Sequence, residues 1–276
     1  MRVSEPNSKL LTIVIPVHKM AFRLGNLENT LRSAASVMDK TNFVIIHDKG
    51  DSATYPQLIA LQRIFSFELF EVEYGSPGLA RNEGMKRSNS EWICFWDSDD
   101  IGNVEEVVNS IIECPREKAV IIGEYEIIKF NEHVASGNLK KRVNSLKHVM
   151  INPGIWRMAF RSSTLGDARF IKGRMGEDQA FLATLNMREG DVFYTRRHFY
   201  KYFIGDPQQL TSNRDSILEI NSAMEKVQEI LKLGNQIEDY VYIIWARLLL
   251  TSIKKDRKST RLNSSHEWIS RMPSSA

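Results

Sequence analysis

Three carboxylates lie close together in the sequence, directly after a short apolar segment. Trp92 to Trp96 is largely apolar, and Asp97, Asp99 and Asp100 follow it. Buried carboxylates cost free energy unless a cation or hydrogen-bond donors hold them. We therefore interpret the segment as a strand that delivers Asp97 and Asp99 to a site at its carboxyl end, where a divalent metal ion and phosphate could meet them. The alternative is a helix N-cap, in which Asp99 or Asp100 caps a helix that begins near Val104.

Apolar and amphipathic segments alternate along the first half of the chain. The pattern predicts strands at 10–17, 43–46, 68–73, 92–96 and 119–130 and helices at 24–38, 55–65, 79–88 and 104–112. This alternation is typical of a doubly wound α/β sheet, which binds ligands beyond the carboxyl ends of its strands. His18, Asp48 and the Asp97–Asp99 pair each follow a predicted strand, so we expect them around one crevice. Their convergence favours the metal site and leaves helix capping to Asp100.

A second acidic site lies in the second half of the chain. Glu177 and Asp178 open a predicted helix that runs through Leu185. A helix N-terminus favours negative charge by itself, so helix capping is a sufficient explanation for the pair at this level. An aromatic and cationic segment, Asn152 to Arg161, precedes the site. A short strand at 192–194 and two helices at 216–233 and 237–253 are predicted after it.

The composition is that of an ordinary globular protein. Of the 276 residues, 42% are hydrophobic and 26% are charged, and a net charge of +3 gives no nucleic-acid-binding signature. Cys94 and Cys114 do not have zinc-site spacing, and Cys94 lies in an apolar strand, which fits a reducing compartment. We find no signal peptide and no apolar run of membrane-spanning length. A cytoplasmic location is therefore expected.

The end of the chain carries two further features. The last predicted helix is rich in large apolar residues and ends in the basic run from Lys254 to Lys258. We interpret it as a helix that packs on the domain or in a homodimer. The alternative is peripheral contact of residues 237–258 with an anionic membrane surface. Residues 259–276 are rich in Ser, lack an apolar period and resemble translated cloning or adapter sequence, so we predict a non-native, disordered tail.

Five motifs follow one another in the order expected of a known family. They are Ile15-Pro16-Val17-His18-Lys19, Asp48-Lys49-Gly50, Pro77-Gly78-Leu79-Ala80-Arg81-Asn82-Glu83-Gly84, Phe95-Trp96-Asp97-Ser98-Asp99-Asp100 and Glu177-Asp178-Gln179. Together they resemble family-2 glycosyltransferases of the GT-A fold, from about Leu11 to Thr211. The stretch from Trp156 to Asp178 also looks like that of bacterial surface-polysaccharide members.

The resemblance implies an overall organisation and a reaction. It implies a GT-A domain at 10–212, divided into a nucleotide-sugar-binding half (10–130) and an acceptor and catalytic-base half (131–212), followed by a helical extension at 213–258. The implied reaction is inverting transfer of one sugar from a nucleotide-diphosphate sugar, most simply a UDP-sugar, to a glycan or lipid-linked glycan, with Mn²⁺ or Mg²⁺. The Q-x-x-R-W motif of processive synthases is absent from the sequence, which argues for addition of a single sugar.

The resemblance also implies roles on the donor side. Asp99, helped by Asp97, would hold the metal against the two phosphates. Asp48 would contact the base, Asp97 would lie near the ribose, and Arg81 would reach the sugar or phosphate. The base pocket would be lined by Pro16, Val17 and His18.

On the acceptor side, the resemblance implies that Asp178 is the general base that takes the proton of the attacking hydroxyl, with Glu177 as the less favoured candidate. Trp156 would offer a face to sugar rings, with core packing as the alternative, and Arg157 would contact the acceptor.

Some residues depart from the family pattern. His47 and Lys49 stand where many relatives carry Asp or Asn, which leaves the preferred base open. His198 is the nearest candidate for a histidine that relatives carry near the position of Tyr202. Two other functions stay open: a non-catalytic relative that binds nucleotide sugars or glycans, and a sugar-phosphate nucleotidyltransferase, for which the expected glycine-rich loop is missing after the first strand.

Overall fold

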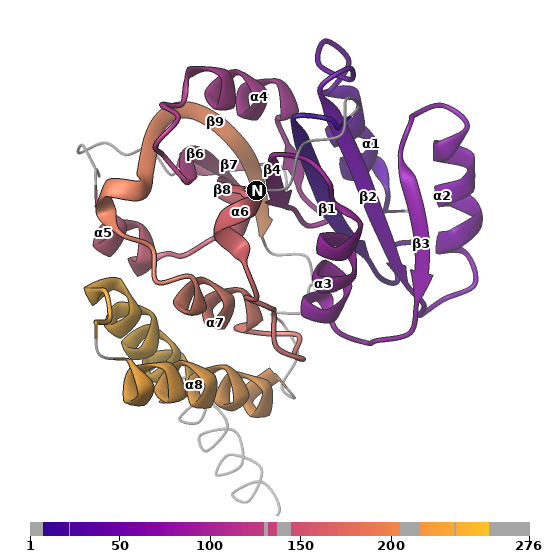
Figure 1. The fold of residues 1–276 in the computed structure, drawn as a ribbon. Helices are drawn as coiled ribbons and strands as arrows, with labels where there is room; N and C mark the ends of the chain where they lie inside the picture. The colour runs from indigo at the N-terminus through magenta and orange to yellow at the C-terminus, as the bar shows by residue number, and fades with distance from the viewer. Residues whose placement is uncertain are drawn as a thin grey trace, which may run out of the picture.

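One mixed sheet forms the centre of the protein (Figure 1). The computed structural model describes residues 8–21, 23–129, 132–136, 145–204, 216–234 and 236–253. The strands are β1 (Leu11–Val17), β2 (Thr41–Asp48), β3 (Glu68–Val72), β4 (Trp92–Phe95), β5 (Ile101–Gly102), β6 (Val120–Lys129), β7 (Glu132–Ser136), β8 (Met158–Arg161) and β9 (Val192–Ile204). Their order is β3-β2-β1-β4-β8-β6-β9-β5, and β7 pairs with β6.

The first four strands form the parallel part of the sheet that the sequence predicted. β1 pairs in parallel with β2 and β4, and β2 pairs in parallel with β3. The direction changes at β8, which is antiparallel to both β4 and β6, while β9 is parallel to β6. The α/β class with a mostly parallel sheet is therefore confirmed, and the carboxyl ends of β1, β2 and β4 meet at one edge.

Helices cover both faces of this sheet. They are α1 (Gly25–Arg32), α2 (Thr54–Gln62), α3 (Pro77–Arg87), α4 (Val104–Glu113), α5 (Leu146–Ile151), α6 (Ser162–Leu165), α7 (Glu177–Thr184) and α8 (Ser216–Leu233), followed by a helix at 239–253. Alternate residues of β1 enter two separate cores: Val14 packs with residues of α3, α7 and α8, and Ile13 packs with residues of α1, α2 and α4. Burial on both faces explains why the strand reads as a continuous apolar run.

Gly84 permits the close approach of α3 to the sheet. A Cβ atom at this position would lie 2.2 Å from Cγ1 of Val14, a fully buried residue of β1. We expect Gly84→Ala to lower the free energy of unfolding by about 1–3 kcal/mol through overpacking, measured by urea denaturation. Gly25→Ala is the matched control, because nothing lies within 4 Å of its added Cβ. Equal stability of Gly84→Ala and the wild type would contradict this explanation of the glycine in the A-R-N-x-G motif.

Several elements differ from the sequence prediction, which did not include β5, β7, β8, α5 or α6. The helix expected at 24–38 ends at Arg32 and continues as turns, and the strand expected at 192–194 runs to Ile204. Polar residues concealed the second half of β9: Arg197 pairs with Glu106 and Glu113, and His198 lies near Glu124. In this half of β9, residues that form ion pairs at the surface replace the apolar residues whose alternation would have identified a strand.

The C-terminal helices share the core of the rest of the chain. Ile220 and Ala223 of α8 and Tyr240, Ile244 and Leu248 of the last helix are buried in the same cluster as the face of the sheet that α3 covers. This agrees with packing on the domain. No helix among the described residues is long and apolar enough to cross a membrane. The basic run 254–258 and the tail 259–276 lie outside the described residues.

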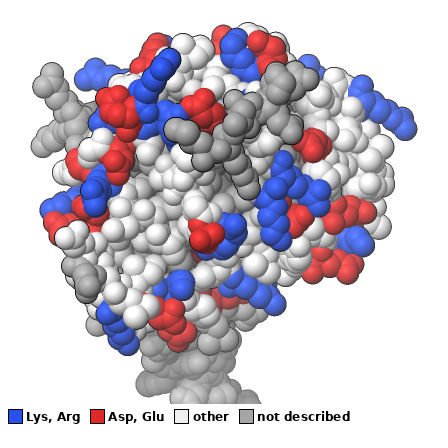
Figure 2. All heavy atoms as spheres, viewed as in Figure 1, with Lys and Arg blue, Asp and Glu red and all other residues white. Residues whose placement is uncertain are grey.

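Charges of both signs intermingle on the surface. On the face seen in Figure 2, lysine and arginine residues lie among aspartate and glutamate residues rather than in a separate field. This agrees with the small net charge of +3.

Candidate active site

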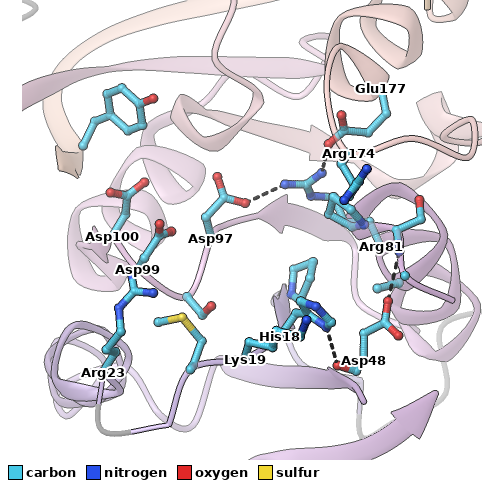
Figure 3. A pocket seen from close by; sticks show the side chains of 18 residues that line it. His18, Lys19, Arg23, Asp48, Arg81, Asp97, Asp99, Asp100, Arg174 and Glu177 are labelled. Atoms are coloured by element: carbon cyan, nitrogen blue, oxygen red, sulfur yellow. Dashed lines mark hydrogen bonds and ion pairs between the residues drawn. The ribbon is translucent and has the colours of Figure 1, made fainter. Parts of the chain in front are cut away.

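A pocket of about 540 Å³ lies beyond the carboxyl ends of β1, β2 and β4 (Figure 3). It is lined by Pro16, His18, Lys19, Met20, Arg23, Asp48, Gly75, Ser76, Pro77, Ala80, Arg81, Asp97, Ser98, Asp99, Asp100, Arg174, Glu177 and Tyr202. The crevice expected from the strand order therefore exists, and most of the residues singled out in the sequence line it. Lys19, Arg23, Arg174 and Tyr202 were not assigned a role from the sequence.

His18 and Asp48 form one end of the pocket. Nδ1 of His18 lies 2.8 Å from the backbone oxygen of Asp48, and the His18 ring occupies the space that a side chain at Gly50 would need. The carboxylate of Asp48 is buried and accepts hydrogen bonds from the backbone N–H groups of Tyr74 (2.8 Å) and Ser76 (3.0 Å). These bonds hold the turn before α3 against β2.

Val17 was expected to line this end of the pocket, but it does not. Its side chain is fully buried in the core beneath α1, because it alternates with Pro16 along β1 and points to the opposite face of the sheet.

Arg81 joins the two acidic motifs. Its guanidinium donates to Asp97 at 2.5 Å and to Glu177 at 2.8 Å, and only 5% of its side chain is exposed. Burial opposes the charge on Arg81, but Asp97 and Glu177 outweigh it and hold the pKa of Arg81 above its ordinary value. The arginine of α3 thereby connects the end of β4 to the start of α7 (Figure 3).

Glu177 and Asp178 begin α7 after a glycine in the left-handed conformation. Gly176 has φ +82°, a region that favours glycine. Burial raises the pKa of Glu177 to about 7, although the charge of Arg81 opposes the shift, and burial likewise raises the pKa of Asp178. Glu177 lines the pocket, whereas Asp178 is not among the lining residues and accepts a hydrogen bond from the N–H of Gln179 at 2.8 Å.

Asp100 is not a helix cap. Asn103 caps α4 by accepting from the N–H of Glu106, and the carboxylate of Asp100 accepts from the N–H of Phe203 on β9 at 2.7 Å. Burial, followed by the charges of Asp99 and Asp97, raises the pKa of Asp100 well above its ordinary value. Asp100 therefore ties the acidic loop to β9.

Asp97 and Asp99 are the residues of the pocket that could hold a metal ion shared with phosphate. Among the residues that the structure describes, no group of three or more His, Cys, Asp or Glu side chains could form a metal site from protein ligands alone. Mg²⁺ in phosphate-transfer sites needs only one or two carboxylates, with substrate phosphate oxygens and water completing its shell. The two partly exposed carboxylates in the pocket fit that requirement.

Trp156 and Arg157 do not lie in the pocket. The Trp156 ring stacks on Tyr200 and Tyr202, with Tyr125 edge-on at 4.6 Å, and the residue is only 9% exposed. The core-packing alternative therefore describes it, because its faces are occupied by aromatic rings. Arg157 is buried and donates from Nε to the backbone oxygen of Gly123. The expected contacts of Trp156 and Arg157 with the acceptor therefore do not agree with the structure, in which both side chains are buried outside the pocket.

His198 does not line the pocket either. Its Nε2 lies 3.2 Å from Glu124 and its Nδ1 lies 3.8 Å from Glu126, both on β6. Tyr202 lines the pocket itself. The idea that His198 replaces a histidine of the relatives at the site is therefore wrong.

Comparison with known proteins identifies the family. The family model described as Glycosyl transferase family 2 matches residues 12–153, just over half of the chain. A curated relative, "Glycosyltransferase GlyA" of Streptococcus pneumoniae serotype 4, is 21% identical over 280 residues, which cover 90% of this chain and 38% of that protein. The chain thus spans well under half the length of this relative.

Solved structures share the fold. S. aureus TarS 1–349 in complex with UDP-GlcNAc superimposes with a TM-score of 0.66 at 16% identity, covering 87% of this chain and 71% of that one. The mannosyltransferase PcManGT from Pyrobaculum calidifontis, in complex with GDP-Man and Mn²⁺, gives a TM-score of 0.62 at 10% identity, covering 96% and 81%. The family match over more than half of the chain establishes that the chain belongs to glycosyl transferase family 2, and the solved structures share its GT-A fold.

Proposed function

We propose that this glycosyltransferase moves one sugar, with inversion, from a nucleotide-diphosphate sugar to a hydroxyl of a glycan or lipid-linked glycan. The observation that carries the proposal is the Arg81 bridge, which brings Asp97 and Glu177 to one pocket from positions 80 residues apart. The nucleobase of the donor would lie near Asp48 and His18, which we call the base end of the pocket. The transferred sugar would lie near Glu177 and Asp178, which we call the transfer end. UDP is the first candidate nucleotide.

The proposed chemistry assigns each proton and bond. The acceptor oxygen attacks the anomeric carbon from the face opposite the leaving phosphate. As that C–O bond forms, the acceptor proton passes to Asp178 and the bond from the anomeric carbon to the phosphate oxygen breaks, so that the nucleoside diphosphate leaves with the electron pair. Arg81 donates a hydrogen bond to Glu177 and so occupies an oxygen of that carboxylate. Asp178 is therefore the preferred base.

Asp99, with Asp97, is proposed to hold the cofactor. Bound Mn²⁺ or Mg²⁺ supplies positive charge to the departing diphosphate. The Mn²⁺ complex of the mannosyltransferase supports this assignment, since that protein has the same fold.

A donor panel tests the function. We expect the protein, with Mn²⁺ or Mg²⁺, to release nucleoside diphosphate from one member of a panel that includes UDP-GlcNAc and GDP-Man, the donors bound by its structural relatives. Asp99→Ala should lose the metal-dependent part of donor binding. Binding without turnover for every donor and acceptor would favour the non-catalytic alternative. Pyrophosphate release from a nucleoside triphosphate and a sugar phosphate would favour the nucleotidyltransferase.

The pH profile should follow the raised pKa values of the acidic pair. Asp178 must be deprotonated to accept a proton, and burial raises its pKa together with that of Glu177, which reaches about 7. Because the pKa of Asp178 is raised, we expect kcat/KM to be full at high pH and to fall, as the pH is lowered, at a higher pH than for an ordinary carboxylate base, which would stay active to about pH 4. A profile that stays flat from about pH 8 down to about pH 4 would contradict these assignments.

A further inference from the structure

The segment from Gly173 to Gly176 contributes Arg174 to the pocket lining and contacts other elements at both of its ends. The hydroxyl of Ser76 donates to the backbone oxygen of Gly173 at 2.9 Å and accepts from its N–H at 3.1 Å. At the other end, a Cβ atom at Gly176 would lie 2.9 Å from Cβ of Ala223 on α8. The segment is therefore held between the turn before α3 and the C-terminal helices.

Glu219 of α8 fixes the one arginine of this segment. Its carboxylate accepts from both the backbone N–H and Nε of Arg174, the latter at 2.7 Å, and Nη2 of Arg174 also lies 2.7 Å from Glu219. The side-on grip on Nε and Nη2 sets the plane of the guanidinium. Arg174 lines the pocket with 40% of its side chain exposed, whereas Glu219 is not among the lining residues.

The position of Arg174 indicates which part of a donor it meets. Gly173, its neighbour, is bonded to Ser76, whose N–H binds Asp48 at the base end. Three residues after Arg174, Glu177 lies at the transfer end. The group that lies between the base and the transferred sugar of a nucleotide sugar is the diphosphate.

The charges of the pocket point to the same group. Arg81 is almost fully buried and is paired with two carboxylates, so it balances the acidic motifs rather than an incoming anion. Arg174 is also paired, with Glu219 through Nε and Nη2, but 40% of its side chain is exposed and it lines the pocket. A guanidinium has five N–H donors, so it can bind a carboxylate and a phosphate oxygen at the same time.

We infer that Arg174 binds the diphosphate of the donor and that Glu219 positions it there, so that the C-terminal extension, beyond the family-matched residues 12–153, completes the donor site. This inference rests on the proposed function. Arg174 then stabilises the leaving nucleoside diphosphate alongside the metal, and Glu219 acts only through Arg174.

Nucleotide binding tests the inference without turnover. Binding of UDP, UMP, GDP and GMP to the full chain is measured by calorimetry with Mn²⁺. Arg174→Ala should weaken binding of the preferred diphosphate about 10- to 100-fold, as expected for a lost charge-assisted hydrogen bond, and should weaken the monophosphate far less. Arg174→Lys should restore part of the loss. Glu219→Gln should cost less than Arg174→Ala, and its effect should vanish in the Arg174→Ala background.

Two exposed residues provide matched controls. Arg169→Ala removes an arginine of the preceding loop that donates to the backbone oxygens of Gly166 and Ala168, and Glu229→Gln changes a glutamate of α8 that pairs with Lys226. Both should bind nucleotides as the wild type does, and circular dichroism confirms that every variant is folded. If folded Arg174→Ala binds the diphosphate as tightly as the wild type, with or without a raised KM for the acceptor, the inference is overturned but the proposed function is not. Failure of the wild type to bind any of the four nucleotides would overturn the proposed function as well.

Discussion

Asp178→Asn should bind the donor nucleotide like the wild type and transfer sugar about 10²- to 10⁴-fold more slowly, the contribution typical of a general base. The substitution keeps the size of the side chain and its ability to accept from the N–H of Gln179. It removes the basic oxygen that would receive the acceptor proton. Single-turnover transfer rates and calorimetric binding of the donor nucleotide, measured in parallel, separate the chemical step from binding.

Asp167→Asn is the matched control for this variant, because Asp167 is an exposed aspartate in the loop that precedes the site. It should transfer sugar at the wild-type rate. Glu177→Gln changes the partner of Arg81 and should lower stability as well as activity, whereas Asp178→Asn should lower transfer and leave nucleotide binding unchanged. Transfer by Asp178→Asn at the wild-type rate would show that Asp178 is not the base.

Arg81→Met should destabilise the protein by about 3–5 kcal/mol, the cost of leaving buried charges without their partner. Arg81 is nearly inaccessible and neutralises Glu177, whose side chain is 7% exposed, together with Asp97. Without the guanidinium, the buried carboxylate of Glu177 and the partly exposed carboxylate of Asp97 lose their shared partner. Urea unfolding measures the loss, and transfer should fall with it because the acidic motifs are no longer held together.

Lys86→Met on the same helix is the control, because its exposed ion pair with Glu83 contributes at most about 1 kcal/mol. The double variant Arg81→Met/Glu177→Gln should recover part of the stability, since it removes one of the stranded charges. Arg81→Met with wild-type stability would mean that the buried bridge is energetically neutral.

The sequence predicted the parallel half of the fold well, and the reason is local. β1, β2 and β4 are buried on both faces, so their residues form continuous apolar runs that no helix period disturbs. Strands that end in polar residues at one sheet edge place those residues together, which is why His18, Asp48, Asp97 and Asp99 were expected around one pocket.

The second half of the fold was predicted less well. β9 carries charged residues whose partners come from α4 and β6, so its pattern resembles that of a loop. In the sequence, Trp156 and Arg157 resemble residues that contact a ligand. Nothing near them in the sequence indicates that tyrosines stack on Trp156 or that a backbone carbonyl binds Arg157.

The sequence by itself determined the fold class and the set of acidic motifs, because apolar periodicity and strand ends depend on near neighbours along the chain. Only the tertiary structure decided how the charged residues are paired. The Arg81–Glu177 contact spans 96 positions, the Asp100–Phe203 contact 103 and the Arg174–Glu219 contact 45. Burial and partners at such separations determine whether a carboxylate binds an arginine, clamps a strand or stays available as a base, and local sequence patterns do not contain them.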